Sequence, residues 1–330
     1  MPAAITPTEP LSTTPVCLVR AESYDDLALL RGTVEALLEP LGGMGAVVNP
    51  GDRVLLKPNL LTGSRPTKEC TTRPELVYCV AQLVKEAGGK PFLGDGPAFG
   101  SAYGVAKANG YLGLLKDLDI PVVEFHGSRY QTVGESFDHL RLSKEAMDAD
   151  VVINLPKVKS HVQLTVTLGV KNLFGCVPGK MKAWWHLEAG KDADRFGDML
   201  VETARTIAPD LTIVDGILGH EGNGPSGGEP RLLGVLGASR DVFALDRAMV
   251  EILQVDPNQI PTQRAAERLG LHEAELSYPL LTPQDLAIAG WKLPEKMMPI
   301  DFGAPRVLKS TFKHLYIRWI KEPIAAYANR

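Results

Sequence analysis

Short apolar runs typical of buried strands alternate along the chain with segments whose apolar residues recur every three or four positions, as in amphipathic helices. The predicted strands lie at 16–20, 53–58, 91–94, 121–125, 151–155, 211–214 and 232–236. The predicted helices lie at 24–38, 73–87, 102–118, within 164–174, and at 193–208 and 241–253. Repeated strand-then-helix order predicts an α/β fold, with a mainly parallel, doubly wound sheet and helices on both faces, built as one lobe or two.

The domain organisation follows from the evenness of this pattern. No shift in composition marks a linker between residues 15 and 290, so we expect a single α/β domain there. Residues 1–14 are rich in Pro and Thr and are predicted to be a disordered lead-in. Residues 291–330 form a basic tail of net charge +5, whereas the rest of the chain carries −9.

The basic tail contains one predicted amphipathic helix, since apolar side chains recur there at helical spacing. The helix would pack on the protein's own body or on a second subunit. A peripheral contact between residues 305–330 and an anionic membrane surface is the alternative, because aromatic residues opposite basic ones suit an interface. The apolar positions are Phe312, Leu315, Tyr316, Trp319 and Ile320.

Charge and cysteine content narrow the class of protein. The 330 residues carry a net charge of −4, so no general positive field attracts nucleic acid. The four cysteines contain no C-x-x-C pair, which argues against a disulfide framework and a self-contained iron–sulfur site. We find no signal peptide and no apolar stretch of about 18 residues. A reducing, cytoplasmic location is therefore predicted.

Polar residues at the ends of the predicted strands indicate where a ligand would bind, because α/β sheets bind ligands at the carboxyl ends of their strands. Lys57 and Asn59 close one strand and could hold a phosphate or carboxylate. Asp95 lies between two glycines after the next strand and could act as a base. The alternatives are that Lys57 caps the carbonyl end of a helix or pairs with a surface acid, and that Asp95 lies in an ordinary turn.

The segment 154–161 is the densest group of polar residues. If it is extended, Lys157, Lys159 and His161 share one side, because side chains alternate along a strand. An anionic ligand would relieve the repulsion between them, and Asn154 would help to bind it. His161 could act as acid or base near neutral pH. Solvated loop residues are the alternative.

The segment 169–179 places two polar residues among apolar ones, as in a helix that lines a cleft. Loss of solvent would lower the pKa of Lys171 and make it a base or nucleophile. Asn172 would bind the ligand. Cys176 is either a metal or cluster ligand or a small buried apolar residue.

Two further segments carry candidate metal or anion ligands. His186 follows two tryptophans in a predicted loop that could form a lid. Asp215, His220 and Glu221 lie at the end of a strand in a glycine-rich loop, and could bind a divalent metal. Backbone N–H groups at Gly222 and Gly224 could bind an anion instead.

Six ordered motifs give the chain a family resemblance over about residues 14–290. They are LLKPN at 55–59, GDGP at 94–97, NLPKVKSH at 154–161, GVKNLFGCVPG at 169–179, DG with EGNGP at 215–225, and DVFALDRAMVEIL at 241–253. With them the chain resembles the uncharacterised domain-of-unknown-function family 362. The resemblance implies a shared cleft, Asp246 in the family's acidic position, and an association with ferredoxin-like iron–sulfur segments, although the four cysteines lack cluster spacing.

Three functional hypotheses follow. The first is an enzyme of undetermined reaction that binds a small anionic, phosphate- or carboxylate-bearing substrate or cofactor. The second is a redox or metallocofactor-handling protein that uses a divalent metal or an iron–sulfur cluster and works with an electron-transfer partner. The third is a non-catalytic binding module.

Overall fold

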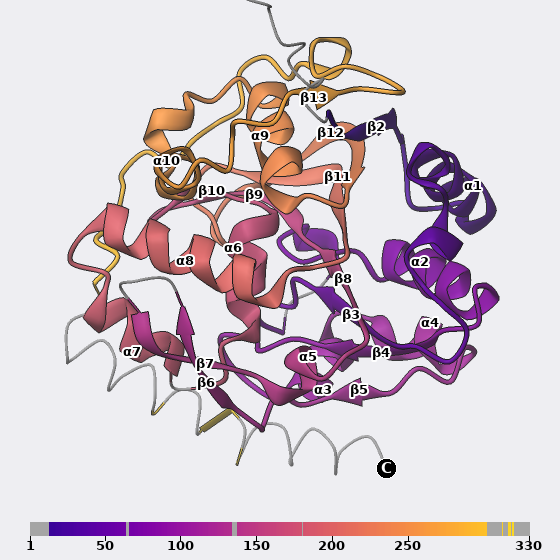
Figure 1. Ribbon diagram of the computed structural model, residues 1–330, viewed down its shortest axis with the longest axis horizontal. Helices are drawn as coiled ribbons and strands as arrows, with labels where there is room; N and C mark the ends of the chain where they lie inside the picture. The colour runs from indigo at the N-terminus through magenta and orange to yellow at the C-terminus, as the bar shows by residue number, and fades with distance from the viewer. Residues whose placement is uncertain are drawn as a thin grey trace, which may run out of the picture.

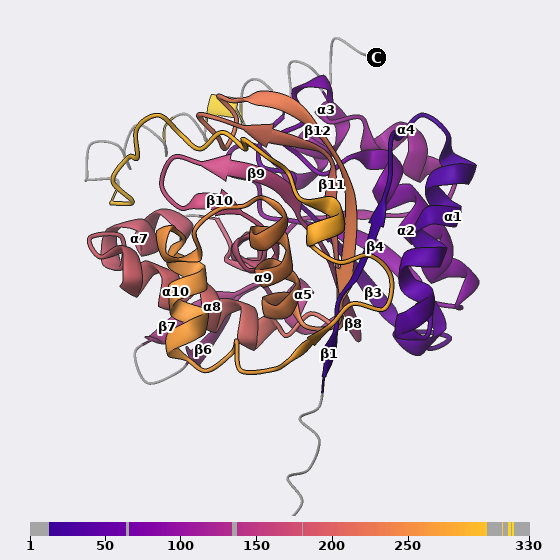
Figure 2. The same cartoon turned by 90° about the horizontal axis from the view of Figure 1, so that it is seen from above.

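The computed structural model describes residues 13–63, 66–133, 137–179 and 181–301, together with Phe312, Tyr316, Ile317 and Trp319. Within these residues, helices cover both faces of a nine-stranded sheet (Figure 1). Figure 2 shows the sheet between a layer with α1, α2 and α4 and a layer with α8, α9 and α10. The predicted α/β class is confirmed.

The large sheet has the order β10-β9-β11-β8-β3-β4-β5, and β12 joins β11 to β2. Its parallel pairs are β5 with β4, β4 with β3, β3 with β8, and β11 with both β8 and β9. The sheet strands are β2 (Cys17–Arg20), β3 (Arg53–Pro58), β4 (Lys90–Gly94), β5 (Val122–Val123), β8 (Val151–Leu155), β9 (Lys157–His161), β10 (Thr165–Thr167), β11 (Leu211–Glu221) and β12 (Glu229–Ser239). Two small sheets pair β1 (Thr14–Pro15) with β13 (Leu276–Ser277), and β6 (Arg129–Val133) with β7 (Phe137–Leu142).

The helices begin at residues that suit helix starts. Asp26 and Asp241 each accept two backbone N–H groups at the starts of α1 and α9, and Pro74 is the first residue of α2. The helices are α1 (Leu27–Leu38), α2 (Pro74–Glu86), α3 (Ala102–Ala108), α4 (Tyr111–Lys116), α5 (Lys144–Met147), α6 (Gly169–Leu173), α7 (Met181–Glu188), α8 (Ala193–Ile207), α9 (Val242–Ile252) and α10 (Pro261–Arg268).

Alternation along the central strands fills a core on each face of the sheet. In β3, Val54 and Leu56 join the core beneath α1 and α2, whereas Leu55 joins the core beneath α6 and α8. In β8, Ile153 joins the core beneath α1 and α2, and Val152 joins the core beneath α6 and α8. Because both faces are covered, a polar side chain in these strands is buried wherever it points.

Three predicted elements differ from the structure, one because of a glycine conformation and two because of pairing between strands. The helix expected at 102–118 divides into α3 and α4, since Gly110 adopts a left-handed conformation with φ of 87°. The helix expected within 164–174 is present as α6 but begins only at Gly169, because Thr165–Thr167 forms β10, which pairs with β9. The loop expected from Gly216 begins only after Glu221, since β11 continues along β12.

Two further differences concern the region around α7. The loop expected at His186 is helix α7, with His186 buried. The hairpin of β6 and β7 has no counterpart in the sequence prediction. Residues 181–188 therefore form a helix, and not the loop that was expected to act as a lid.

The two predicted terminal segments lie mostly outside the described residues. Residues 291–301 are described and contact the body, since Lys292 O accepts from Gly222 N (2.8 Å) and Met298 N donates to Val162 O (2.6 Å). The helix expected beyond residue 305 is described only at the four positions given above. Among the described residues, no helix is long and apolar enough to cross a membrane.

Candidate functional site

The carboxyl edge of the sheet collects the polar side chains that end its strands. Lys57 of β3 lies in register with Asn154 of β8, and each shares a strand face with a residue of the core beneath α6 and α8. Asp95 follows β4, and Asn172 comes from α6. The structure thus brings Lys57, Asn59, Asp95, Asn154, Lys159 and Asn172 together.

Lys57 and Asp95 form a buried ion pair. Lys57 Nζ lies 2.8 Å from Asp95 Oδ1 and 2.9 Å from the carbonyl oxygen of Pro58. Asp95 Oδ2 accepts from Leu60 N at 3.0 Å. A Cβ at Gly175 would lie 2.1 Å from Asp95 Oδ1, so only glycine fits beside the pair. Asp95, predicted as a catalytic base, instead neutralises Lys57.

A row of hydrogen bonds leads from Lys159 through three asparagines. Lys159 Nζ donates to Asn59 Oδ1 (2.7 Å), and Asn59 Nδ2 donates to Asn172 Oδ1 (2.9 Å). Asn172 Nδ2 donates to Asn154 Oδ1 (2.8 Å), and Asn154 Nδ2 donates to the carbonyl oxygen of Gly169 (3.1 Å). The ammonium at one end of this asparagine row can only donate, and the carbonyl oxygen at the other end can only accept. The orientation of each amide in the row is therefore fixed.

Lys157 belongs to a different, charge-balanced cluster. Its Nζ lies 3.2 Å from both Glu69 and Asp215, and donates to Tyr24 Oη at 3.0 Å. Tyr24 in turn donates to Asp215, which also accepts from Arg73 N at 2.9 Å. Two carboxylates neutralise the charge of Lys157. This lysine therefore has no free positive charge for the anionic ligand that the sequence analysis expected it to bind.

Three other lysines have no such partner. In the part of the chain that the structure describes, Lys159, Lys171 and Lys182 form no ion pair with a carboxylate, although Lys159 and Lys182 donate to neutral oxygens. Burial lowers the pKa of Lys159 to about 8, of Lys171 to about 7 and of Lys182 to about 8. We call these three side chains the lysine cluster.

The lysines of the cluster repel one another. After burial, the positive charge of Lys182 and then of Lys159 contributes most to the lowered pKa of Lys171. Lys171 Nζ lies 4.7 Å from the centre of the Phe174 ring, a cation–π distance. Lys171 and Lys182 are partly exposed, so a solute can reach the cluster.

His161 lies beside the lysine cluster as a neutral ring. Burial, followed by the charges of Lys171 and Lys159, holds the pKa of His161 well below its ordinary value. Its Nδ1 accepts from Gln163 N at 3.1 Å, so the hydrogen of the neutral ring is on Nε2. In this tautomer the Nδ1 lone pair is already used, so near neutral pH His161 presents its Nε2–H as a hydrogen-bond donor, and not the free lone pair that the base role expected from the sequence would need.

The candidate metal ligands on β11 have other partners. Asp215 belongs to the Lys157 cluster. His220 Nε2 accepts from Gly228 N (3.0 Å), and its Nδ1 lies 2.9 Å from the carbonyl oxygen of Lys68. Glu221 pairs with Arg231 at 2.8 Å. These three side chains are held by protein groups.

The remaining two metal candidates lie on the other side of the sheet, in the core beneath α6 and α8. Burial raises the pKa of the Cys176 thiol to about 12. His186 Nδ1 lies 3.0 Å from Ile300 O, and its ring packs against Phe174 and Phe196. Among the described residues, no three His, Cys, Asp or Glu side chains are grouped to hold a metal ion.

The two glycines predicted to bind an anion have packing roles. A Cβ at Gly224 would lie 1.9 Å from the carbonyl oxygen of Ser160, so a side chain has no room there. Gly222 has φ of 82°, and its N–H donates to the carbonyl oxygen of Lys292 at 2.8 Å. Its N–H group is thus already used by residues 291–301.

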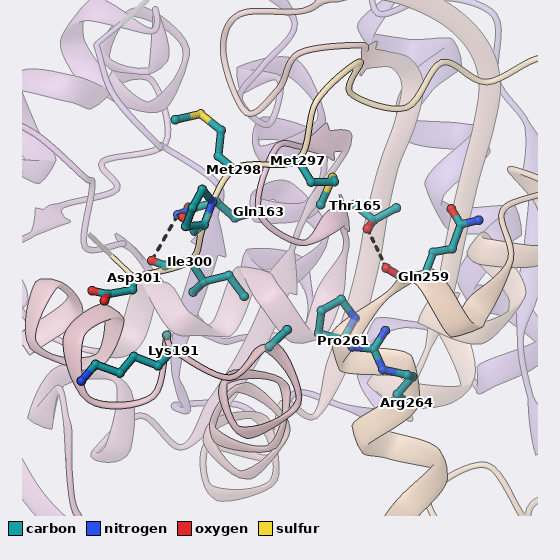
Figure 3. Close-up of a pocket in the computed structure, with 13 residues that line it drawn as sticks. Gln163, Thr165, Lys191, Gln259, Pro261, Arg264, Met297, Met298, Ile300 and Asp301 are labelled. Carbon is teal, nitrogen blue, oxygen red and sulfur yellow. Dashed lines mark hydrogen bonds between the residues drawn. The ribbon is translucent and has the colours of Figure 1, made fainter. Parts of the chain in front are cut away.

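A cavity of about 510 Å³ lies among Gln163, Thr165, Gln259 and residues 297–301, and none of the lysines of the cluster lines it (Figure 3). Gln163 Nε2 donates to Pro299 O (2.8 Å) and Ile300 O (3.2 Å), and Thr165 Oγ1 donates to Gln259 O (2.6 Å). The sequence gives no sign of this cavity or of the place of Lys182, because both depend on contacts between distant segments.

This fold and site define an α/β protein with a cationic group at the carboxyl edge of its sheet. Residues 54–251 match the family described as "Domain of unknown function (DUF362)", and the chain belongs to that family. A thylakoid-associated protein of Synechocystis sp. is 68% identical over 317 residues, which cover 96% of this chain and 98% of the relative.

A solved structure with the same class of fold gives a more distant likeness. The lactate racemase apoprotein from Thermoanaerobacterium thermosaccharolyticum has a TM-score of 0.47 and 14% sequence identity to this chain. The matched region covers 72% of this chain and 57% of the racemase chain.

Proposed function

We propose that the protein is an enzyme that binds a small anionic substrate, bearing a phosphate or carboxylate, at the lysine cluster. The observation that carries this proposal is that the charges of Lys159 and Lys182 both act on Lys171, while none of the three has an ion-pairing carboxylate among the described residues. A positive charge on Lys159, which is buried, is costly without an anionic partner, and a bound anion would offset that cost.

Asn59 and His161 complete the proposed site. Asn59 orients Lys159 without neutralising it, because the group that accepts is an amide oxygen. His161, neutral and next to two lysines, is the proposed hydrogen-bond donor to the anion, and Lys171 is the proposed base or nucleophile. The site then has three potential positive charges and one N–H donor for an anion, and one group for proton transfer.

Sulfate is a suitable probe for the site, because its charge is constant across neutral pH. We expect Lys159→Met to weaken sulfate binding by roughly tenfold or more, the usual contribution of a hydrogen bond to a charged group. Titration calorimetry would measure the affinity, and thermal unfolding would check the fold. Lys116→Met, at an exposed position on α4, is the matched control. Equal affinities for wild type and Lys159→Met would reject the site.

A second proposal concerns where the protein acts. We propose peripheral attachment to an anionic membrane surface through the C-terminal segment. Phe312, Tyr316 and Trp319 are 69%, 56% and 73% exposed, and follow one another at helical spacing. Residues 291–330 carry a net charge of +5. The thylakoid-associated relative agrees with attachment to a membrane. The predicted cytoplasmic location stays a prediction.

Vesicle sedimentation would test this attachment. We expect the full chain to sediment with vesicles that contain phosphatidylglycerol, and much less with phosphatidylcholine alone, because basic residues favour anionic lipids. Replacing Phe312, Tyr316 and Trp319 together with Ser should release the protein. Tyr103→Ser removes an equally exposed aromatic residue elsewhere and is the control. Sedimentation that survives the triple replacement would contradict the proposal.

A further inference from the structure

One amine of the lysine cluster differs from the other two in its surroundings. Lys159 Nζ donates to Asn59 and to the carbonyl oxygen of Cys70, and Lys182 donates to the carbonyl oxygen of Gly96. Lys171 Nζ, within the described residues, has only the face of the Phe174 ring as a partner. Its side chain is partly exposed. Lys171 is thus the amine of the cluster that is free to approach a bound molecule.

We propose that Lys171 is a nucleophile that forms an imine with an aldehyde or ketone whose anionic group is held by Lys159 and Lys182. This inference rests on the proposed anion site and names the class of its substrate. A carbonyl compound with a phosphate or carboxylate would use both features of the cluster: the two amines with fixed acceptors bind charge, and the third reacts.

The charges around Lys171 favour the neutral amine that such a reaction needs. Lys182 from α7, Lys159 from β9 and Lys57 from β3 all lower its pKa, and Asp95 raises it. His161 also faces Lys171 and stays neutral. Burial and these charges bring the pKa of Lys171 to about 7, so about half of the amine is unprotonated at neutral pH.

The reaction balances without any oxidant or reductant. The lone pair of Lys171 Nζ attacks the carbonyl carbon, and the carbon–oxygen double bond is replaced by a carbon–nitrogen double bond. The oxygen leaves as one water molecule with the two hydrogens of the amine. The Nε2–H of neutral His161, next to Lys171, is the proposed hydrogen-bond donor to that oxygen as it leaves.

Pyridoxal 5′-phosphate is a probe with both an aldehyde and a phosphate. The protein would be treated with it and with sodium cyanoborohydride, which reduces an imine to a stable amine, and the labelled lysines mapped by peptide mass spectrometry. We expect Lys171 to be labelled roughly tenfold or more faster than exposed Lys116, because far more of its amine is neutral. Pyridoxal without phosphate should label Lys171 much more slowly, and sulfate should slow the labelling by the phosphate form.

The outcomes separate this inference from the proposed function. Sulfate binding without preferred labelling of Lys171 would overturn the imine and leave the anion site in place, whereas loss of both would overturn both. Preferred labelling that does not depend on the phosphate, or that falls on Lys159 or Lys182, would also overturn the inference. Lys171→Arg keeps the charge and should lose the label, since guanidinium does not deprotonate. The map of the wild-type protein decides the question even if this variant does not fold.

Discussion

Asp95→Ala is expected to lower the free energy of unfolding by about 3 to 5 kcal/mol, the cost of leaving one buried charge without its partner. Lys57 is 0% exposed and Asp95 is 3% exposed, so water does not replace the lost carboxylate. The backbone N–H of Leu60 loses its acceptor as well. Chemical denaturation of the wild type and the variant would measure the difference.

Two further variants make this result specific to burial. Glu35→Ala removes one carboxylate from Arg31 on the exposed surface of α1, and should cost less than about 1 kcal/mol. Lys57→Met combined with Asp95→Leu removes both charges and should recover much of the loss, because an apolar pair needs no solvation. A cost for Asp95→Ala no greater than that for Glu35→Ala would contradict the ion pair.

The affinity for sulfate is expected to fall by about 100-fold between pH 6 and pH 9, because Lys159 and Lys182, which hold the anion, each lose about nine tenths of their charge over that range. The pKa of Lys171 is about 7, and those of Lys159 and Lys182 are about 8. An anion binds the protonated amines, so affinity is highest below these values and lost as the pH rises through them. Calorimetry in a series of buffers would measure the fall.

The pH profile has its own control. Lys171→Arg keeps a positive charge throughout this range and leaves Lys159 and Lys182, whose pKa values are about 8, so the fall in affinity should persist in this variant. An affinity for sulfate that is constant from pH 6 to pH 9 would show that the lysine cluster does not hold the anion.

The sequence predicts well those features that neighbouring residues determine. The strand Arg53–Pro58 has the predicted bounds, and the helix expected at 241–253 begins after Asp241, whose carboxylate caps it. The segment from Lys157 to His161 is the strand β9, which was one of the two conformations considered for it, the other being a solvated loop. Each of these depends on a local pattern or on a capping side chain.

The sequence does not predict those features that depend on residues distant in the chain. Lys157 was expected to bind a ligand, but Glu69 and Asp215, 88 and 58 positions away, neutralise it. Thr165–Thr167 becomes a strand only because β9 lies beside it. Asp246, on α9, accepts from the N–H groups of Gly169 and Val170, a cap for α6 that no nearby residue provides. Periodicity and turn residues carry no information about such partners.

The asparagine row has an electrical consequence. Every amide in it points its N–H₂ away from Lys159 and its oxygen toward it, so the side-chain dipoles are aligned. Their negative end faces the ammonium and stabilises it as a partial charge would, yet the row adds no net charge. Replacing any of the three by Asp would supply a full counter-charge instead. The row therefore holds a cation in a buried place while leaving its field available to a visiting anion.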